Sequence, residues 1–371
     1  MRSPRVLVAP DKFKGSVTGV EAARLIADGV LRAAPAAEVH THPIADGGDG
    51  TLDAMLNTGY RWVPARARDA IGRPIETGFA ENRGHAVIEL ATICGLQRAP
   101  EPLDPLAACS SGVGDVILAA SEFGCDTITL ALGGSASTDG GAGMLRALGV
   151  RLLDDSGEEL PFGGGALTEL AEVRTAGLDP RIEGRRFVLA GDVTNPLLGD
   201  NGAAVTYGPQ KGATPGQVRQ LEMGLTRFAE LLDPDVTDRP GAGAAGGVGY
   251  AAQAVLRARY DSGSRVVLSA TGLSEELNTF DVVITGEGSM DAQSSYGKAP
   301  GTLACLARES GTPVLAISGQ CSLDAAQLDE IGIRRAWQLR TVEPDLEKCL
   351  HRADALLPEL AETAFRWWMS E

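Results

Sequence analysis

Short apolar runs typical of strands alternate with helical patterns along the first part of the chain. The apolar run Arg5–Ala9 is followed by a polar loop and then by residues 20–30, whose hydrophobic positions recur at helical spacing. Thr18 and Glu21, three positions apart, form a capping pattern that predicts a helix start near residue 19. The order strand, loop, helix is typical of a unit in a parallel α/β sheet.

The same unit recurs further along the chain. A strand predicted over Glu38–Ile44 leads through ADGGDGT to a helix from about Leu52, and the apolar strand DVVIT precedes a helix predicted over 301–309. Repetition of this unit predicts a parallel sheet whose loops gather at one edge. The chain closes with a helix predicted over 346–366.

Residues 60–90 have a different pattern, with short alternating segments separated by Gly, Pro and Asn, as in the strands of a mixed sheet. Further strands are predicted over Thr127–Leu132 and Arg186–Ala190, and helices over 110–123, 140–148, 215–232 and 248–257.

The fold class predicted from these patterns is α/β with two domains. Residues 1–70 and 276–371 form a doubly wound parallel-sheet domain of the Rossmann or flavodoxin-like type, and residues 71–275 form an inserted mixed α/β domain. We expect the active site in the cleft between the two domains.

Composition narrows the possible functions. A chain of 371 residues exceeds what one hydrophobic core usually serves, and 47 glycines with 5% aromatic residues indicate many tight turns. The net charge of −16 disfavours nucleic acids and anionic membrane surfaces as partners, because both are bound through basic surfaces. The six cysteines are widely spaced without a CxxC pair, and no secretory signal or membrane span is visible, which predicts reduced thiols and a cytoplasmic protein.

Several loops combine glycine with charged or hydroxyl residues. Asp11–Ser16 brings two lysines to a predicted helix start, and ADGGDGT places Asp46 and Asp49 among glycines that would let a ligand or hydrated cation approach. The segment from Gly133 to Gly143 follows a strand and is rich in exposed backbone amides and hydroxyls, which favours a phosphate or carboxylate cradle. Each loop can also be interpreted as a solvated turn that binds no ligand.

Three further segments carry weaker signals. Asp192 and Asn195 follow a predicted strand, Lys211 lies in a turn, and Gly286–Asp291 follows DVVIT, with Lys298 before the next helix. The literal GxGxxG at 241–246 follows a polar linker where a dinucleotide fold needs a strand, so a glycine hinge or a close-approach loop is the better interpretation. The four histidines lack zinc-site spacing.

Together these motifs resemble the bacterial glycerate kinase family, of the type that phosphorylates the 2-hydroxyl of D-glycerate. The resemblance covers nearly the whole chain through APDKFKGS, ADGGDGT, SSGVGD, LGGSASTDGGAGM, GDVTNPLLG, YGPQKGAT, PGAGAAGG and VITGEGSMDAQSSYGKAP. It implies a two-domain kinase that uses ATP with Mg²⁺ and forms 2-phosphoglycerate. The family usually has Arg where Ser289 stands, so another cation such as Lys298 would have to replace it.

Phosphoryl transfer requires anion clamps, a divalent cation and a group that orients or deprotonates the hydroxyl. For catalysis we expect Asp291 as the base with Asp192 as the second candidate, and Lys12 as a charge-neutralising group. Asp46, Asp49 or Asp192 would hold magnesium through water. Substrate and phosphate binding is assigned to Lys14, Ser16, Gly133, Gly134, Ser135, Ser137, Thr138, Asp139, Asn195, Lys211, Gly286, Glu287 and Lys298.

The expected partners are ATP and D-glycerate, with no nucleic acid and no membrane, and a homodimer is left open. Three alternatives remain at this point: a kinase that forms 3-phosphoglycerate, a kinase of another small hydroxy acid or a triose, and a regulator that binds a hydroxy acid without ATP turnover. The residues alone do not separate attack by the 2-hydroxyl from attack by the 3-hydroxyl, because the two differ by about one bond in placement.

Overall fold

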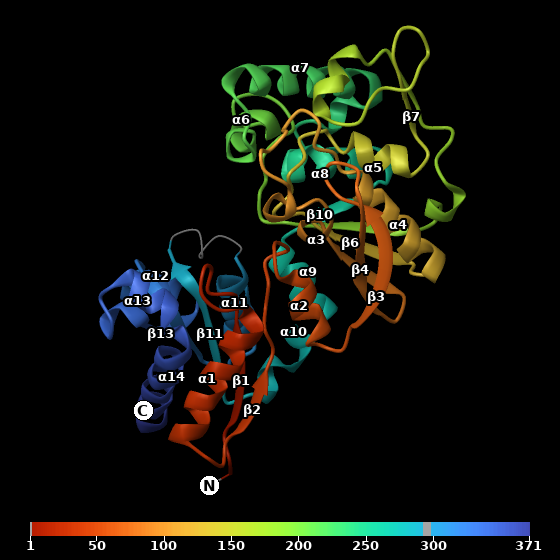
Figure 1. Ribbon diagram of the computed structural model, residues 1–371. Coiled ribbons are helices and arrows are strands. Elements are labelled where there is room, and N and C mark those ends of the chain that lie inside the picture. Colours follow the sequence, from red (N-terminus) through yellow and green to blue (C-terminus); the bar gives the residue numbers. More distant parts are fainter. Residues whose placement is uncertain (1, 292–297) are drawn as a thin grey trace. The chain divides into compact units, whose positions relative to one another are not determined.

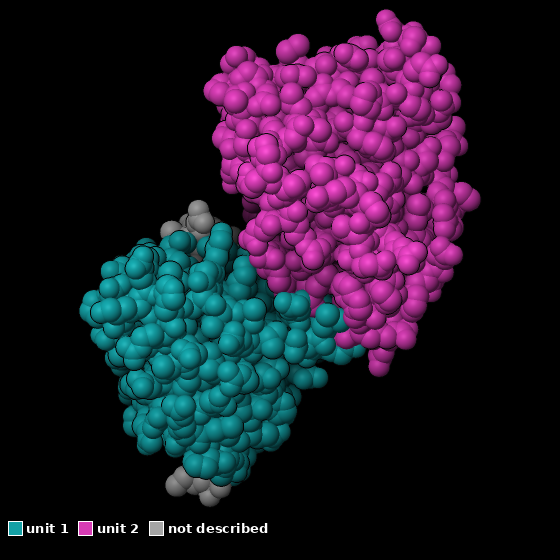
Figure 2. Space-filling model, in the orientation of Figure 1, with its two compact units in different colours: residues 1–46, 53–59, 262–371 teal, residues 47–52, 60–261 magenta. Residues whose placement is uncertain are grey.

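The computed structural model describes residues 2–291 and 298–371. The chain divides into two compact units (Figures 1 and 2). Unit 1 comprises residues 1–46, 53–59 and 262–371, and unit 2 comprises residues 47–52 and 60–261. The sequence places the domain crossings near residues 70 and 275, and those domain bounds stay a prediction.

Unit 1 is built on a parallel sheet of five strands in the order β13-β12-β11-β1-β2. In chain order this is 2-1-3-4-5, the flavodoxin-like arrangement. The strands are β1 (Arg5–Pro10), β2 (Glu38–Thr41), β11 (Val282–Met290), β12 (Val314–Cys321) and β13 (Ile333–Gln338). The helices are α1 (Gly19–Ala33), α2 (Thr51–Leu56), α9 (Gly263–Ala270), α10 (Leu273–Glu276), α11 (Ala299–Glu309), α12 (Ala325–Glu330), α13 (Leu346–His351) and α14 (Ala353–Ser370).

Alternate side chains of β1 enter different hydrophobic cores, as expected for a sheet that is covered on both faces. Val6 and Val8 join the core formed with α1 and α14, whereas Leu7 and Ala9 join the core formed with α10 and α11. Helices α1 and α14 pack side by side (Figure 1). The predicted doubly wound α/β fold is therefore confirmed.

Unit 2 contains a six-stranded mixed sheet in the order β10-β9-β6-β5-β4-β3. Its strands are β3 (Arg61–Arg68), β4 (Pro74–Asn82), β5 (His85–Glu89), β6 (Thr127–Ala131), β9 (Arg186–Ala190) and β10 (Arg259–Asp261), and a separate hairpin is formed by β7 (Arg151–Leu153) and β8 (Glu172–Arg174). The helices are α3 (Ala91–Cys94), α4 (Ser111–Phe123), α5 (Ala142–Ala147), α6 (Ala203–Tyr207), α7 (Pro215–Leu232) and α8 (Ala244–Val255).

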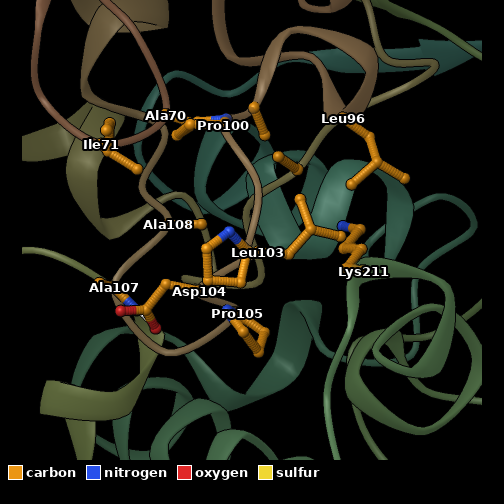
Figure 3. Close-up of a pocket in the computed structure, with 13 residues that line it drawn as sticks. Ala70, Ile71, Leu96, Pro100, Leu103, Asp104, Pro105, Ala107, Ala108 and Lys211 are labelled. Atoms are coloured by element: carbon orange, nitrogen blue, oxygen red, sulfur yellow. Dashed lines mark hydrogen bonds between the residues drawn. The ribbon is translucent and has the colours of Figure 1, made fainter.

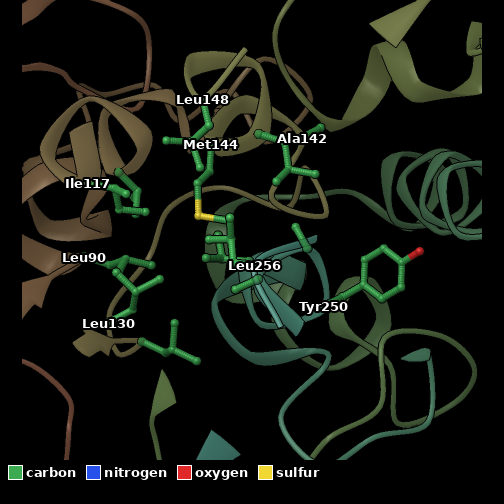
Figure 4. Close-up of a cluster of buried hydrophobic side chains, with 14 of the residues drawn as sticks. Leu90, Ile117, Leu130, Ala142, Met144, Leu148, Tyr250 and Leu256 are labelled. Atoms are coloured by element: carbon green, nitrogen blue, oxygen red, sulfur yellow. The ribbon is translucent and has the colours of Figure 1, made fainter. Parts of the chain in front are cut away.

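The core of unit 2 joins the sheet to its helices. Leu90, Leu130 and Met144 are fully buried in it, together with Tyr250 of α8 (Figure 4). The parallel strands from β5 to β10 direct their carboxyl ends to one edge, where the glycine-rich loops follow.

Most predicted elements lie within a few residues of their observed bounds, and the cap of α1 is present because the Thr18 hydroxyl accepts a 3.1 Å hydrogen bond from the Glu21 amide. The single closing helix predicted over 346–366 is wrong. The backbone leaves the helical region at Arg352, at φ −120° and ψ 18°, and a new helix starts at Ala353. Neither Arg352 nor its neighbours His351 and Ala353 is Gly or Pro, so the sequence carries no signal for the break.

All six cysteines, each within the described residues, are free thiols, as predicted. Among the described residues, no helix has the length and apolar character that crossing a membrane requires.

Candidate active site

The carboxyl ends of β1 and β11 meet at the point where the strand order of unit 1 reverses. The Asp11 amide, just after β1, donates a 2.8 Å hydrogen bond to the Gly286 carbonyl in β11. Open α/β sheets bind ligands at such a switch point, outside the carboxyl ends of the strands. A pocket of about 490 Å³ opens here. Its lining includes Asp11, Lys12, Lys14, Ser16, Asp46, Glu287, Ser289, Lys298 and Gln320.

Asp11 is a buried carboxyl group of this pocket, with 7% of its surface exposed, the same fraction as for Glu287. Burial and the nearby negative charge of Asp46 raise its pKa to about 7, although the Lys12 ammonium and the Lys12 amide, 2.6 Å from Oδ1, oppose the shift. A carboxyl with a pKa near neutrality can hold or release a proton at physiological pH. Asp11 was not among the predicted site residues, although its place directly after a buried strand was an available signal.

Lys298 lies between two acidic side chains. Its Nζ is 3.9 Å from Glu287 Oε2 and 3.9 Å from Asp291 Oδ1. Glu287 is buried and Asp291 is about 40% exposed. The Ser289 hydroxyl accepts a 3.1 Å hydrogen bond from the Gln320 side-chain amide. The rest of this motif, residues 292–297, lies outside the described residues.

The loop after β1 is fixed by its apolar and hydroxyl residues. Phe13 is buried and pairs with Val17 through backbone hydrogen bonds, and the Ser16 hydroxyl donates a 2.6 Å hydrogen bond to the Leu350 carbonyl. Lys14 is exposed and Lys12 is half-buried, and both line the pocket. The backbone is therefore held while two ammonium groups are presented at the switch point.

The predicted phosphate loop of unit 2 is packed inside the unit. Ser135, Ser137 and Thr138 are buried, whereas Gly133 and Gly134 are more accessible. Within the part of the chain that the structure describes, the hydroxyls of Ser137 and Thr138 have no hydrogen-bond partner. Such buried orphan hydroxyls call for an explanation, and a bound ligand or water is one.

Asp139 anchors this loop. It is fully buried, and its carboxylate accepts hydrogen bonds from the amides of Gly141 and Gly143 and from the amide and hydroxyl of Ser110. Burial raises its pKa, and these four hydrogen bonds oppose the rise. They tie the loop to the start of α4. The role of Asp139 in binding phosphate stays a prediction.

Lys211 is a buried cation beneath the same loop, with 4% of its surface exposed. Its ammonium donates to the Ser137 carbonyl and lies 3.2 Å from the Ser135 hydroxyl oxygen. Burial lowers its pKa to about 8, so the side chain remains mostly charged at pH 7.

The ADGGDGT motif is divided between the units, with Asp46 in unit 1 and Asp49 in unit 2. Gly48 passes so close to Gly133 that a Cβ on Gly133 would lie 2.4 Å from the Gly48 Cα. Glu89, buried at the end of β5, accepts hydrogen bonds from the amides of Gly50 and Leu52 at 3.2 and 2.8 Å. Sequence reasoning missed Glu89, since an acid inside an apolar strand end carries no motif of its own.

The segment after β9 is held by side-chain contacts. The Asn195 amide donates to the Asn201 carbonyl at 2.8 Å, and its oxygen accepts from the Tyr207 hydroxyl at 2.7 Å. Asp192 is exposed in this segment, and its negative charge contributes to a raised pKa of Tyr260, after burial as the main cause. The GxGxxG segment also has a packing role, because a Cβ at Gly246 would lie 2.0 Å from the Ser137 carbonyl oxygen.

A 2-1-3-4-5 parallel sheet with lysines and carboxylates at its switch point defines a doubly wound α/β protein with a charged ligand pocket at the carboxyl edge of its sheet. The profile of the glycerate kinase family matches residues 6–369. The chain is 41% identical over 365 residues to a glycerate kinase of Halalkalibacterium halodurans, covering 96% of both chains. It is 39% identical over 359 residues to glycerate 2-kinase of Escherichia coli, covering 94% of both.

A solved structure is also similar to this chain. The crystal structure of a candidate glycerate kinase 2 from Salmonella typhimurium LT2 superimposes with a TM-score of 0.86 at 34% identity, covering 100% of this chain and 99% of the other. The chain belongs to the glycerate kinase family and is therefore a kinase.

Proposed function

We propose that this protein transfers the γ-phosphoryl group of ATP to the 2-hydroxyl of D-glycerate, giving 2-phosphoglycerate and ADP. The observation that carries the proposal is the pocket at the β1/β11 switch point, where Lys12, Lys14 and Lys298 meet Asp11 and Glu287 in a chain of this family. The name glycerate 2-kinase of the Escherichia coli relative supports the 2-hydroxyl.

In the proposed reaction, the glycerate hydroxyl oxygen attacks the γ-phosphorus, the bond from that phosphorus to the β–γ bridging oxygen breaks, and the hydroxyl proton passes to a carboxylate. Lys12, Lys14 and Lys298 neutralise the glycerate carboxylate and the transferring phosphoryl group. Asp291 is the first candidate for the base and Asp192 the second. Lys298 lies 3.9 Å from Asp291 and would orient its carboxylate.

Phosphate binding by the loop from Gly133 to Thr138 belongs to the same proposal. The orphan hydroxyls of Ser137 and Thr138 and the ammonium of Lys211 beneath them support a ligand near this loop. Ser16 and Asn195 would act by holding their loops, because their side chains already bond to Leu350, Asn201 and Tyr207.

Asp46, Asp49 or Asp192 would hold Mg²⁺ through water. Among the described residues, no three His, Cys, Asp or Glu side chains form a ready metal cluster. Mg²⁺ in phosphotransferases is usually held by one or two carboxylates together with substrate phosphates, so isolated carboxylates fit this mode of binding. When bound with ATP, the ion would neutralise charge on the phosphate oxygens.

ATP and D-glycerate are the proposed partners, and we place the protein in the cytoplasm, where both are available. Nucleic acid and membrane are not proposed as partners, given the net charge of −16. A homodimer stays a prediction that light scattering would test.

The decisive experiment measures ADP release by the purified protein with ATP, magnesium and D-glycerate, followed by enolase without phosphoglycerate mutase. Glycerate-dependent ADP release with immediate phosphoenolpyruvate supports the proposal. ADP release without phosphoenolpyruvate moves the phosphate to the 3-hydroxyl, and a panel of other hydroxy acids and trioses tests a different acceptor. Absence of ADP release from folded protein contradicts the proposed reaction.

A further inference from the structure

A second cavity, of about 280 Å³, lies within unit 2 at the carboxyl edge of its sheet. Its walls are almost entirely apolar and include Ile71, Leu96, Leu103 and Pro105, with the Lys211 side chain on one side (Figure 3). The switch-point pocket of unit 1 is different, because lysines and carboxylates line it. The two cavities therefore suit ligand groups of different chemistry.

Lys211 is the main polar feature of this cavity. Two of its contacts are the Ser137 carbonyl and the Ser135 hydroxyl, the latter at 3.2 Å. An ammonium group has three donors, so a further one is available for an acceptor in the cavity. Among the described residues, the only other charged one in the lining is Asp104. It is exposed and caps its own turn by accepting hydrogen bonds from the amides of Leu106 and Ala107.

We propose that this cavity binds the purine base of the nucleotide, with the Lys211 ammonium donating to a ring nitrogen. The inference rests on the proposed function, since it assigns a subsite to the ATP of that reaction. A purine has flat apolar faces, which the leucine and proline walls would cover, and acceptor nitrogens at its edge, which match a single buried donor.

The other parts of the substrates fit this cavity less well. Glycerate is polar at every carbon, so most of its hydrogen-bonding groups would face apolar walls at a free-energy cost. A triphosphate would bring several negative charges against one ammonium group in apolar surroundings, and that cost is larger still.

The proposal is tested by a substitution that places a large side chain at the opening of the cavity. Ala107 lines the cavity and is exposed, so Ala107→Trp can place a ring in the opening with little disturbance of the core. Calorimetric titration compares Mg²⁺–ATP with Mg²⁺–tripolyphosphate, which lacks the base. We expect the dissociation constant for ATP to rise at least about tenfold and that for tripolyphosphate to change less than about twofold. Ala176→Trp, at an exposed alanine of the same unit outside the cavity lining, is the control and should leave both constants unchanged.

An unchanged affinity for ATP in folded Ala107→Trp overturns the proposal, as does an equal weakening of ATP and tripolyphosphate. If Ala107→Trp does not fold, Ala99→Phe, at a half-buried position of the same wall, is judged by the same criteria. The titration measures ATP binding alone and needs no glycerate. A wild-type protein that binds ATP but releases no ADP with glycerate would contradict the proposed reaction, while the variants still decide the base subsite. A wild-type protein that does not bind ATP overturns the subsite.

Discussion

The backbone amide of Asp11 donates a 2.8 Å hydrogen bond to the carbonyl oxygen of Gly286, and this bond joins the ends of β1 and β11 at the switch point of unit 1. Asp11 and Gly286 are far apart in the sequence, yet this contact fixes the backbone beneath Lys12 and Glu287. The chemistry proposed for the pocket therefore depends on how closely the neighbouring strands approach one another.

Replacement of Gly286 tests that approach. A Cβ at this position would lie 1.8 Å from the carbonyl oxygen of Ile317 in β12. Overpacking an interior typically costs about 1–3 kcal/mol, so Gly286→Ala should lower the midpoint of thermal unfolding, measured by circular dichroism, by several degrees. Gly216→Ala is the control, because its nearest neighbours would be 3.9 Å and 4.0 Å away. Equal midpoints for Gly286→Ala and the wild type would contradict this account of the strand packing.

Asp11 predicts a specific pH dependence of stability. Its pKa is raised from 3.8 to about 7 in the folded protein, so between these values the folded state binds more protons than the unfolded state. The contribution of Asp11 to the free energy of unfolding should therefore fall as the pH rises from about 4 to about 7, by at most about 1.4 kcal/mol per pH unit.

The Asp11→Asn variant isolates this effect because it cannot titrate. Urea unfolding of both proteins without nucleotide or magnesium should show the wild type losing stability relative to Asp11→Asn across this window. A stability difference that stays constant from pH 4 to pH 7 would show that the folded-state pKa of Asp11 is not raised.

The proposed base is tested by Asp291→Asn. A general base typically contributes about 10²–10⁴-fold to the rate, so kcat should fall by at least about 100-fold, with folding intact by circular dichroism. Asp329→Asn, at an exposed acid of the same unit, is the matched control and should keep wild-type kcat. A smaller loss in Asp291→Asn removes it from the role and directs the same test to Asp192.

Features with a local cause were predictable from the sequence. The Thr18 cap depends on residues three positions apart, and the alternation of Val6 and Val8 with Leu7 and Ala9 is expected for a strand covered on both faces. The glycine-rich loops were predicted to follow strands, because turn residues and strand ends are both local signals.

Features that depend on tertiary contacts were not predictable in the same way. The raised pKa of Asp11 depends on its burial and on the approach of Asp46 and Glu287, which are brought together by β1, β11 and the segment after β2. Lys211 was selected as a binding residue, but its burial beneath Ser135, 76 residues earlier in the chain, has no counterpart in local spacing. Sequence patterns indicated which residue types matter, whereas packing determines which of them titrate near neutrality.

The buried Lys211 side chain predicts a pH dependence of stability at higher pH than that of Asp11. Burial lowers its pKa from 10.5 to about 8, so between these values the unfolded state binds more protons than the folded state. The free energy of unfolding should therefore rise between pH 8 and pH 10.5 through this group, by at most about 1.4 kcal/mol per pH unit, while the cost of burying the charge is fully present below pH 8.

Lys211→Met removes the titrating group and keeps an unbranched side chain of similar length. Denaturant unfolding from pH 7 to pH 10 should show the wild type gaining stability relative to Lys211→Met above pH 8. Lys348→Met, at an exposed lysine, is the control and should show no such change relative to the wild type. A flat difference between the wild type and Lys211→Met would mean that the ammonium is hydrated in the folded protein, which would also remove the apolar setting on which the purine subsite depends.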